Sequence, residues 1–314
     1  MDSLIFSLNA TVPVFAVIFI SYLLKKRGFF PEAFTTAADK IVFKVFLPVM
    51  LFQDIAAGRI VENFDLKFFL FCSLSTTVYF LGIWAFAELF LKDKSMVGAF
   101  TQASFRGSMA VMGVAFIQNI YGNAGLAPLM IVAAVPLYNV YSVLVLTVRG
   151  QHPQNGRRFA WDIVKGILTN PLILGILAGL PFSLLEIEFP VAVSKTIGFF
   201  AAPATPLALM LIGAEFEGAK ALQKVKPTLV ASFIKLIALP AIFLPAAYLM
   251  GFRNQELVSI LIMTGAPSTV TCYIMAKNMG GDAILSSSII VLTTALSALT
   301  MTAALYVMRC MGIV

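Results

Sequence analysis

The sequence predicts an all-α membrane protein of about ten transmembrane helices, built as two inverted five-helix repeats with broken, crossing fourth and ninth helices. Composition is the first observation behind this class. Of the 314 residues, 60% are hydrophobic and only 12% are charged, whereas soluble domains carry about 25% charged residues. The second observation is that apolar runs of roughly 18–25 residues recur, which is the length of a helix that crosses a bilayer. The third is an internal repeat.

The apolar runs give ten expected spans. They are 4–24, 38–57, 67–91, 97–121, 125–148, 163–181, 191–214, 228–250, 257–279 and 283–309. No basic residue precedes the first run, and the cluster Lys25-Lys26-Arg27 follows it. A cleaved signal peptide shows the reverse order, so we expect the first run to be a retained helix.

Basic residues predict the orientation. If both termini lie outside, most of the 22 Lys and Arg residues fall in the inner connections, including the polar 149–162 loop. Cytoplasmic connections carry such an excess, so the pattern predicts a multi-pass protein of the cell (plasma or inner) membrane. The same topology explains the net charge of +7, and we expect no nucleic-acid partner.

The fourth and ninth spans resemble each other in sequence. FIQNIYGNA aligns with MAKNMGGDA, so that Asn119 meets Asn278 and Gly122 meets Gly281. The offset of 159 positions continues into the next helix, where two Ile-Val pairs coincide. A constant offset across two consecutive helices favours a true repeat over a likeness of composition.

The repeat divides the chain into two units. Residues 1–150 form the first five-helix repeat, 151–162 a cytoplasmic loop, and 163–314 the second repeat. Because five is an odd number, the second unit lies upside down relative to the first. Inverted repeats are a common plan of secondary transporters.

The ninth span contains the block Gly265-Ala266-Pro267-Ser268-Thr269 near its middle. Proline donates no backbone hydrogen bond and clashes with the preceding turn, so we expect the helix to break there. Ser268 or Thr269 is expected to cap the new helix N-terminus. The N–H groups at such a start attract anions, and a break at membrane depth has to line a protein cavity.

The equivalent position of the fourth span is Arg106-Gly107-Ser108. A charged side chain inside a span is costly and usually faces a cavity or a partner. The fork of donors in a guanidinium fits a carboxylate, so Arg106 is expected to contact an anionic ligand. The alternative is a structural cation that pairs with helix C-terminal carbonyls or snorkels to the cytoplasmic face.

The fifth span adds Tyr138 and Asn139 beside Pro136. Both side chains can supply hydrogen bonds to a ligand, although Asn139 can equally bond a neighbouring helix. Lys235 in the eighth span is either a second cation near the path or a snorkelling lysine.

Several classes of function are disfavoured. No acidic residue lies securely at mid-membrane, so nothing suggests a cation pump or a proton relay. The three cysteines have no metal-site spacing, and there is no P-loop. We therefore expect no enzyme activity, no cofactor and no metal site.

Six segments in order carry a family resemblance: FLPVMLF (46–52), FRGSMAVMGVAFIQNIYG (105–122), VPLYNV (135–140), TNPLILGILAGL (169–180), PLALMLIGAEF (206–216) and GAPSTVTCYIMAKNMGGD (265–282). Together they resemble the auxin efflux carrier family, in its bacterial branch of malonate- and malate-permease-like proteins. The resemblance implies a substrate site where the fourth and ninth helices cross, and a scaffold and a transporting part within a homodimer. Members often carry asparagine and a later proline in the fourth span, where this chain has Ser108 and Ala115.

The function expected from the residues and the resemblance is a secondary transporter, or permease, that moves a small organic anion such as a carboxylate across the bilayer by alternating access. The substrate-binding residues expected are Arg106, Gly107, Ser108, Tyr138, Asn139, Ala266, Pro267, Ser268 and Thr269. The alternatives are a carrier or channel for a neutral or hydrophobic solute, and a membrane sensor that transports nothing. Substrate identity, direction and coupling ion stay open at this point.

Overall fold

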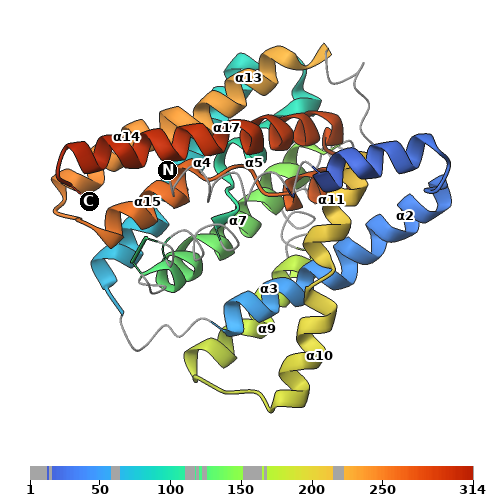
Figure 1. The fold of residues 1–314 in the computed structure, drawn as a ribbon, viewed down its shortest axis with the longest axis horizontal. Coiled ribbons are helices and arrows are strands. Elements are labelled where there is room, and N and C mark those ends of the chain that lie inside the picture. The colour runs from blue at the N-terminus through green and yellow to red at the C-terminus, as the bar shows by residue number, and fades with distance from the viewer. Residues whose placement is uncertain are drawn as a thin grey trace.

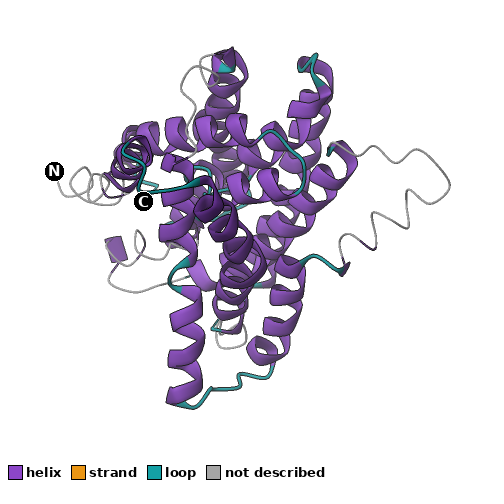
Figure 2. Cartoon of the chain, turned by 90° about the vertical axis from the view of Figure 1, so that its right-hand side faces the viewer, coloured by secondary structure: helices purple, strands orange, loops and turns teal. Residues whose placement is uncertain are grey.

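The described part of the chain is helical (Figure 2). The computed structural model describes residues 13, 16–57, 64–109, 117, 120–121, 126–150, 165, 168–214 and 223–313. Within these ranges the only strand-like feature is one isolated bridge, between Gly107 and Ser268. The all-α class predicted from the sequence is therefore confirmed.

The described helices, in chain order, are residues 16–26, α2 (Glu32–Ile41), the π-helix η1 (Val42–Phe46), α3 (Leu47–Ala56), α4 (Leu66–Phe90), the 3-10 helix η2 (Lys94–Met96), α5 (Val97–Phe105), α7 (Ala127–Arg149), α9 (Pro171–Leu184), α10 (Val191–Ala201), α11 (Ala204–Ala214), α13 (Val225–Phe233), the π-helix η3 (Ile234–Ala238), α14 (Leu239–Leu249), α15 (Gln255–Gly265), α16 (Thr271–Asn278) and α17 (Ala283–Cys310).

Four helical stretches among the described residues are long and apolar enough to cross a membrane. They are Leu66–Phe90, Leu129–Arg149, Val191–Ala214 and Val225–Leu249, with a fifth if the bent α17 counts as one span. The expected spans 67–91, 125–148, 191–214 and 228–250 match these four closely. The expected span 257–279 does not pass the same test, because it is interrupted near its middle. The expected span 97–121 lies partly outside the described residues, and its described helix α5 ends at Phe105.

Two expected spans start or divide differently from the prediction. The helix expected to begin at residue 38 begins at Glu32, because α2, η1 and α3 follow one another without a break. The span 191–214 is divided into α10 and α11 by a turn at Ala202 and Pro203. Pro203 lacks a backbone donor and interrupts the helical hydrogen bonds there.

The helices pack in two groups (Figure 1). In one group α3 packs on α9 and α10. In the other, α4, α5 and α7 pack on one another, while α17 packs on α13 and α16. The α3–α9 contact needs glycine: a Cβ at Gly175 would collide with the backbone of Pro48, and one at Gly179 would lie 2.9 Å from the Phe52 carbonyl oxygen. Small residues allow such close helix approach in membranes.

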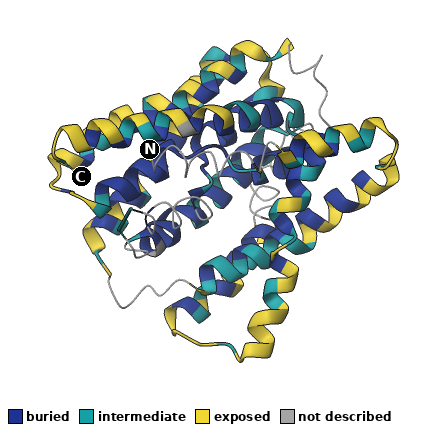
Figure 3. Ribbon diagram, in the orientation of Figure 1, coloured by how far each residue is buried: buried dark blue, intermediate teal, exposed yellow. Residues whose placement is uncertain are grey.

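Figure 3 shows in yellow the exposed residues on the outer faces of the helices, and many of these residues are large and hydrophobic. On α4 the exposed residues Leu70, Leu74, Val78 and Leu81 recur every three or four positions and form one stripe. Keeping such a side chain in water rather than in an apolar medium costs about 1.5–3 kcal/mol. The stripe is unfavourable in water and suited to lipid, which agrees with the spans predicted from the sequence.

Candidate functional site

The ends of two helices meet at the centre of the larger group. α5 ends at Phe105 and α15 ends at Gly265, and the backbone becomes extended after each helix. Gly107 pairs with Ser268 in an antiparallel bridge, and the Ser108 N–H donates to the Pro267 carbonyl at 2.9 Å. The interruptions therefore lie where the sequence predicted them.

Gly107 allows the two extended segments to lie close together. A Cβ added at this position would lie 3.0 Å from Lys235 Nζ and 3.3 Å from the Ala266 carbonyl oxygen. Ala266 itself is buried. A side chain at Gly107 would thus be in tight contact on two sides.

The role expected for Ser268 as a helix cap is wrong. The N-cap of α16 is Val270, and no side chain caps this helix. The Ser268 hydroxyl donates instead to the Ala103 carbonyl of α5 at 2.5 Å, since that carbonyl lies directly across the bridge. Thr269 does not cap either: its hydroxyl contacts Thr271 Oγ1 at 3.4 Å, and the side chain is half-buried.

The N-terminus of α16 therefore keeps free donors. The backbone N–H groups of Thr269, Val270 and Thr271 have no acceptor among the described residues. Ser108, Thr269 and Val270 are also the half-buried residues of the crossing, while their neighbours are buried. Donors at a helix start that face a partly open side are a typical anion-binding arrangement.

Arg106 is 4% exposed and directs its guanidinium into the protein. Nη2 donates to Asn139 Oδ1 at 2.8 Å, and Nη1 lies 3.5 Å from Ser142 Oγ and 2.9 Å from Met275 Sδ. The Asn139 amide donates to the Val135 carbonyl at 2.9 Å, which turns its oxygen toward Arg106. The structure thus brings Arg106 and Asn139 together, as direct partners.

Ser142 was not among the residues that the sequence pointed to. It follows Asn139 by three positions on α7, so the two side chains share one helix face. A serine three positions after Asn139, in a protein with an arginine inside a span, was the sequence feature that could have pointed to Ser142.

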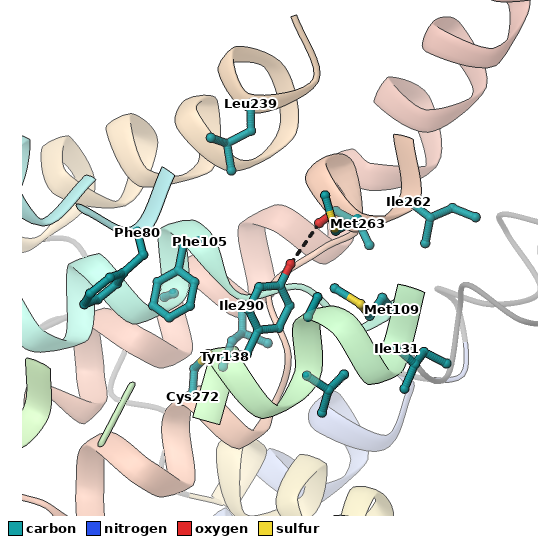
Figure 4. Close-up of a cluster of buried hydrophobic side chains, with 14 of the residues drawn as sticks. Phe80, Phe105, Met109, Ile131, Tyr138, Leu239, Ile262, Met263, Cys272 and Ile290 are labelled. Carbon is teal, nitrogen blue, oxygen red and sulfur yellow. Dashed lines mark hydrogen bonds between the residues drawn. The ribbon is translucent and has the colours of Figure 1, made fainter. Parts of the chain in front are cut away.

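The Tyr138 hydroxyl already has protein partners. It donates to the Met263 carbonyl at 3.1 Å and lies 2.7 Å from the Tyr79 hydroxyl. Figure 4 shows the side chain among Phe105 and Cys272, with its hydroxyl directed at Met263. Tyr138 therefore links α4, α7 and α15 beside the crossing.

Lys235 is fully buried and does not snorkel. Its Nζ lies 3.3 Å from the Phe105 carbonyl oxygen, 3.2 Å from that of Met263 and 3.1 Å from that of Thr264. These carbonyls belong to the last turns of α5 and α15, where helices leave acceptors unpaired.

The described ion pairs use other residues. Glu88 pairs with Arg149 and Lys94, Asp282 with Lys224, and Asp39 with Lys277. In the described ranges neither Arg106 nor Lys235 meets a carboxylate, and no cluster of His, Cys, Asp or Glu could hold a metal. The crossing thus holds two buried basic side chains that only neutral groups contact among the described residues.

Two hollows lie away from the crossing. One of about 570 Å³ between α3, α9 and α10 is lined by Gln53, Glu186 and Glu188, so it is acidic. The other, of about 630 Å³, lies on α14 and α17 and has almost only apolar walls. Neither offers the positive groups that gather at the crossing.

Interrupted helices that cross inside an apolar helical protein, with basic side chains at the interruptions, are typical of membrane proteins. The chain belongs to the family described as "Membrane transport protein", whose profile matches residues 6–305. The resemblance to the auxin efflux carrier family is thereby confirmed, and the protein is membrane-embedded.

Two relatives cover nearly the whole chain. A protein of Rhizobium meliloti named "Putative malonate transporter" is 25% identical over 315 residues, which cover 95% of this chain and 94% of the relative. A protein of Methanothermobacter thermautotrophicus named "Uncharacterized transporter" is 22% identical over 296 residues, or 93% and 95% of the two chains.

Proposed function

We propose that the protein is a secondary transporter that moves a small organic anion, such as a carboxylate, across the cell membrane by alternating access. One observation carries this proposal: Arg106 and Lys235 are buried at the crossing without a carboxylate among the described residues. Removing a charge from water is expensive unless it is paired, so a bound anion would supply the missing counter-charge.

The geometry suggests how the anion would bind. Three of the five N–H donors of a guanidinium have acceptors at Arg106, and the 3.5 Å contact to Ser142 is long for a hydrogen bond. The remaining donors would form hydrogen bonds to one side of a bound carboxylate. The free N–H groups at Thr269 and Val270, together with the Ser108 hydroxyl, would form hydrogen bonds to its other side. Asn139 would orient the guanidinium, and Tyr138, Gly107, Ala266, Pro267 and Ser268 would shape the crossing.

Burial supports alternating access. At 4% exposure Arg106 is out of reach of solvent, so a ligand reaches it only after the surrounding helices move. The two packing groups offer a plausible division into a scaffold with α3, α9 and α10 and a moving part with α5, α15 and α16. A transporter of this plan rocks one part against the other around the site.

The inverted repeat and ten spans belong to the same proposal. Leu66–Phe90 and Val225–Leu249 are both 25 residues long, and their ends are 159 positions apart, the offset found in the sequence. Both following helices, α5 and α15, break, and their extended segments run antiparallel. An inversion of the second unit relative to the first would produce this antiparallel crossing. Both termini would then lie outside, and assembly as a homodimer is part of the expectation.

The name of the Rhizobium relative favours a dicarboxylate as the first substrate to test. The experiment is uptake of labelled malonate by proteoliposomes that contain purified protein and are preloaded with unlabelled malonate, malate or succinate. Saturable counterflow that empty liposomes lack is expected. If no organic anion in such a panel gives counterflow, the anion transporter is refuted, and neutral solutes become the next class to screen.

A further inference from the structure

Lys235 occupies an unusual position between two helix ends. Its Nζ lies within 3.1–3.3 Å of three backbone carbonyl oxygens, one from α5 and two from α15. The side chain belongs to the π-helix η3, which joins α13 to α14. The C-terminal ends of two helices thus meet at one amine.

The number of acceptors fits a charged amine. An ammonium carries three N–H donors and no acceptor, which matches three carbonyls. A neutral amine has two hydrogens, and its lone pair would face a carbonyl oxygen. The negative ends of the two helix dipoles also favour a positive charge at this point.

The same oxygen set suits a free cation. Unwound backbone carbonyls and half-helix C-termini are the groups with which transporters of broken-helix design hold Na⁺. Rings of carbonyl oxygens likewise replace the hydration shell of monovalent cations in channels. The Lys235 amine therefore lies where the carbonyl oxygens could otherwise coordinate a small monovalent cation. Its charge is attached covalently to the chain.

We propose that Lys235 is a tethered cation that takes the place of a coupling ion at the crossing. The wild-type protein then needs no Na⁺ at this position, and removing the side chain opens a site for a small free cation. The role in transport rests on the proposed function, whereas the cation site itself does not.

The first experiment measures thermal unfolding of purified protein in choline chloride, sodium chloride and propylammonium chloride. Lys235→Ala removes the atoms of a propylammonium ion, so this ion is the matched probe. The melting midpoint of Lys235→Ala is expected to fall by about 5 °C or more in choline chloride, because three carbonyls lose their donor. Propylammonium or Na⁺ should restore a large part of the loss.

The control is Lys44→Ala, which removes an exposed lysine from the other described π-helix, η1. Its midpoint and that of the wild type are expected to be the same in all three salts. A Lys235→Ala midpoint that equals the wild type, or that no cation raises above its value in choline, overturns the proposal.

The second experiment measures malonate counterflow with Na⁺, K⁺ or choline as the only cation. Wild-type rates are expected to agree within about twofold, and a loss of tenfold or more in choline overturns the tethered cation. Lys235→Met keeps the stem but has no donor, and its counterflow should fall at least about tenfold in every salt. Wild-type counterflow in this variant also overturns the proposal. If the wild type carries no anion at all, the proposed function fails while the melting experiment still decides the cation site.

Discussion

Arg106→Gln is the sharpest test of the anion site. Glutamine keeps a polar group on a shorter side chain but removes the charge and the fork of donors. In the wild type the guanidinium is fixed by Asn139 at 2.8 Å, while its contact to Ser142 at 3.5 Å is weak. A carboxylate can therefore replace the Ser142 contact without disturbing the bond to Asn139.

The size of the effect follows from the bonds that would be lost. A hydrogen bond to a charged group contributes about 1.5–3 kcal/mol. Two such bonds between Arg106 and a carboxylate give at least about 3 kcal/mol, which corresponds to about a hundredfold loss of affinity. Arg106→Lys, which keeps the charge but not the fork, should lie between glutamine and wild type.

The assay is malonate counterflow over a range of concentrations, with Arg309→Gln as the control. Arg309 is exposed at the end of α17, so its loss should leave transport unchanged. Thermal unfolding of each variant separates a lost contact from a lost fold. If Arg106→Gln transports malonate with an apparent affinity within about threefold of wild type, Arg106 is a structural cation and the proposed site is wrong.

Three further predictions concern backbone and packing. Pro267→Ala should restore a backbone donor at the crossing, straighten the ninth span and lower counterflow at least about tenfold; wild-type turnover would contradict a role for the break. Gly107→Ala places a Cβ 3.0 Å from Lys235 Nζ. It should lower thermal stability by about 1–3 kcal/mol and reduce transport, whereas an unchanged melting curve would speak against the close packing. Gly175→Val should prevent α9 from packing on α3 and yield little folded protein by size-exclusion chromatography; a wild-type elution profile would disprove the glycine requirement.

Local chemistry explains which parts of the site could be predicted from the sequence. The break at Pro267 depends on a missing N–H and a steric clash, both properties of one residue and its neighbours. Arg106 and Asn139 were each recognisable as polar groups inside apolar runs. The pairing of Arg106 with Asn139 was not recognisable from the sequence, because it depends on how α5 packs on α7.

The partners of Lys235 and Ser268 show where sequence reasoning stops. A lysine in an apolar span can snorkel or turn inward, and only the convergence of α5 and α15 on η3 supplies the three carbonyls that hold it. Ser268 precedes a helix start and so resembles a cap, but the Ala103 carbonyl of a helix distant in sequence competes for its hydroxyl. The structure leaves the α16 N–H groups free as a result.

The two proposed repeats differ at the crossing in a way that would bear on the proposed transport cycle. Under the proposed repeat, Lys235 corresponds to Thr76, 159 positions earlier on α4. Thr76 is also buried, but it bonds the Tyr79 hydroxyl, which in turn contacts Tyr138. The Met263 carbonyl is the meeting point of both arrangements, since it accepts from Tyr138 at 3.1 Å and from Lys235 at 3.2 Å.

This inequality has a consequence for energetics. Two repeats with identical chemistry at the crossing would give inward-open and outward-open states of equal energy. Under the proposed repeat, one unit supplies a chain of neutral hydroxyls and the other supplies Lys235. The proposed movement of the crossing against the scaffold would therefore change the surroundings of a charge that comes from one unit alone. Charges contribute more strongly than hydroxyls in a medium of low dielectric constant. The proposed tethered cation would therefore bias the empty transporter toward one side, and a bound anion would reduce that bias by neutralising the charge.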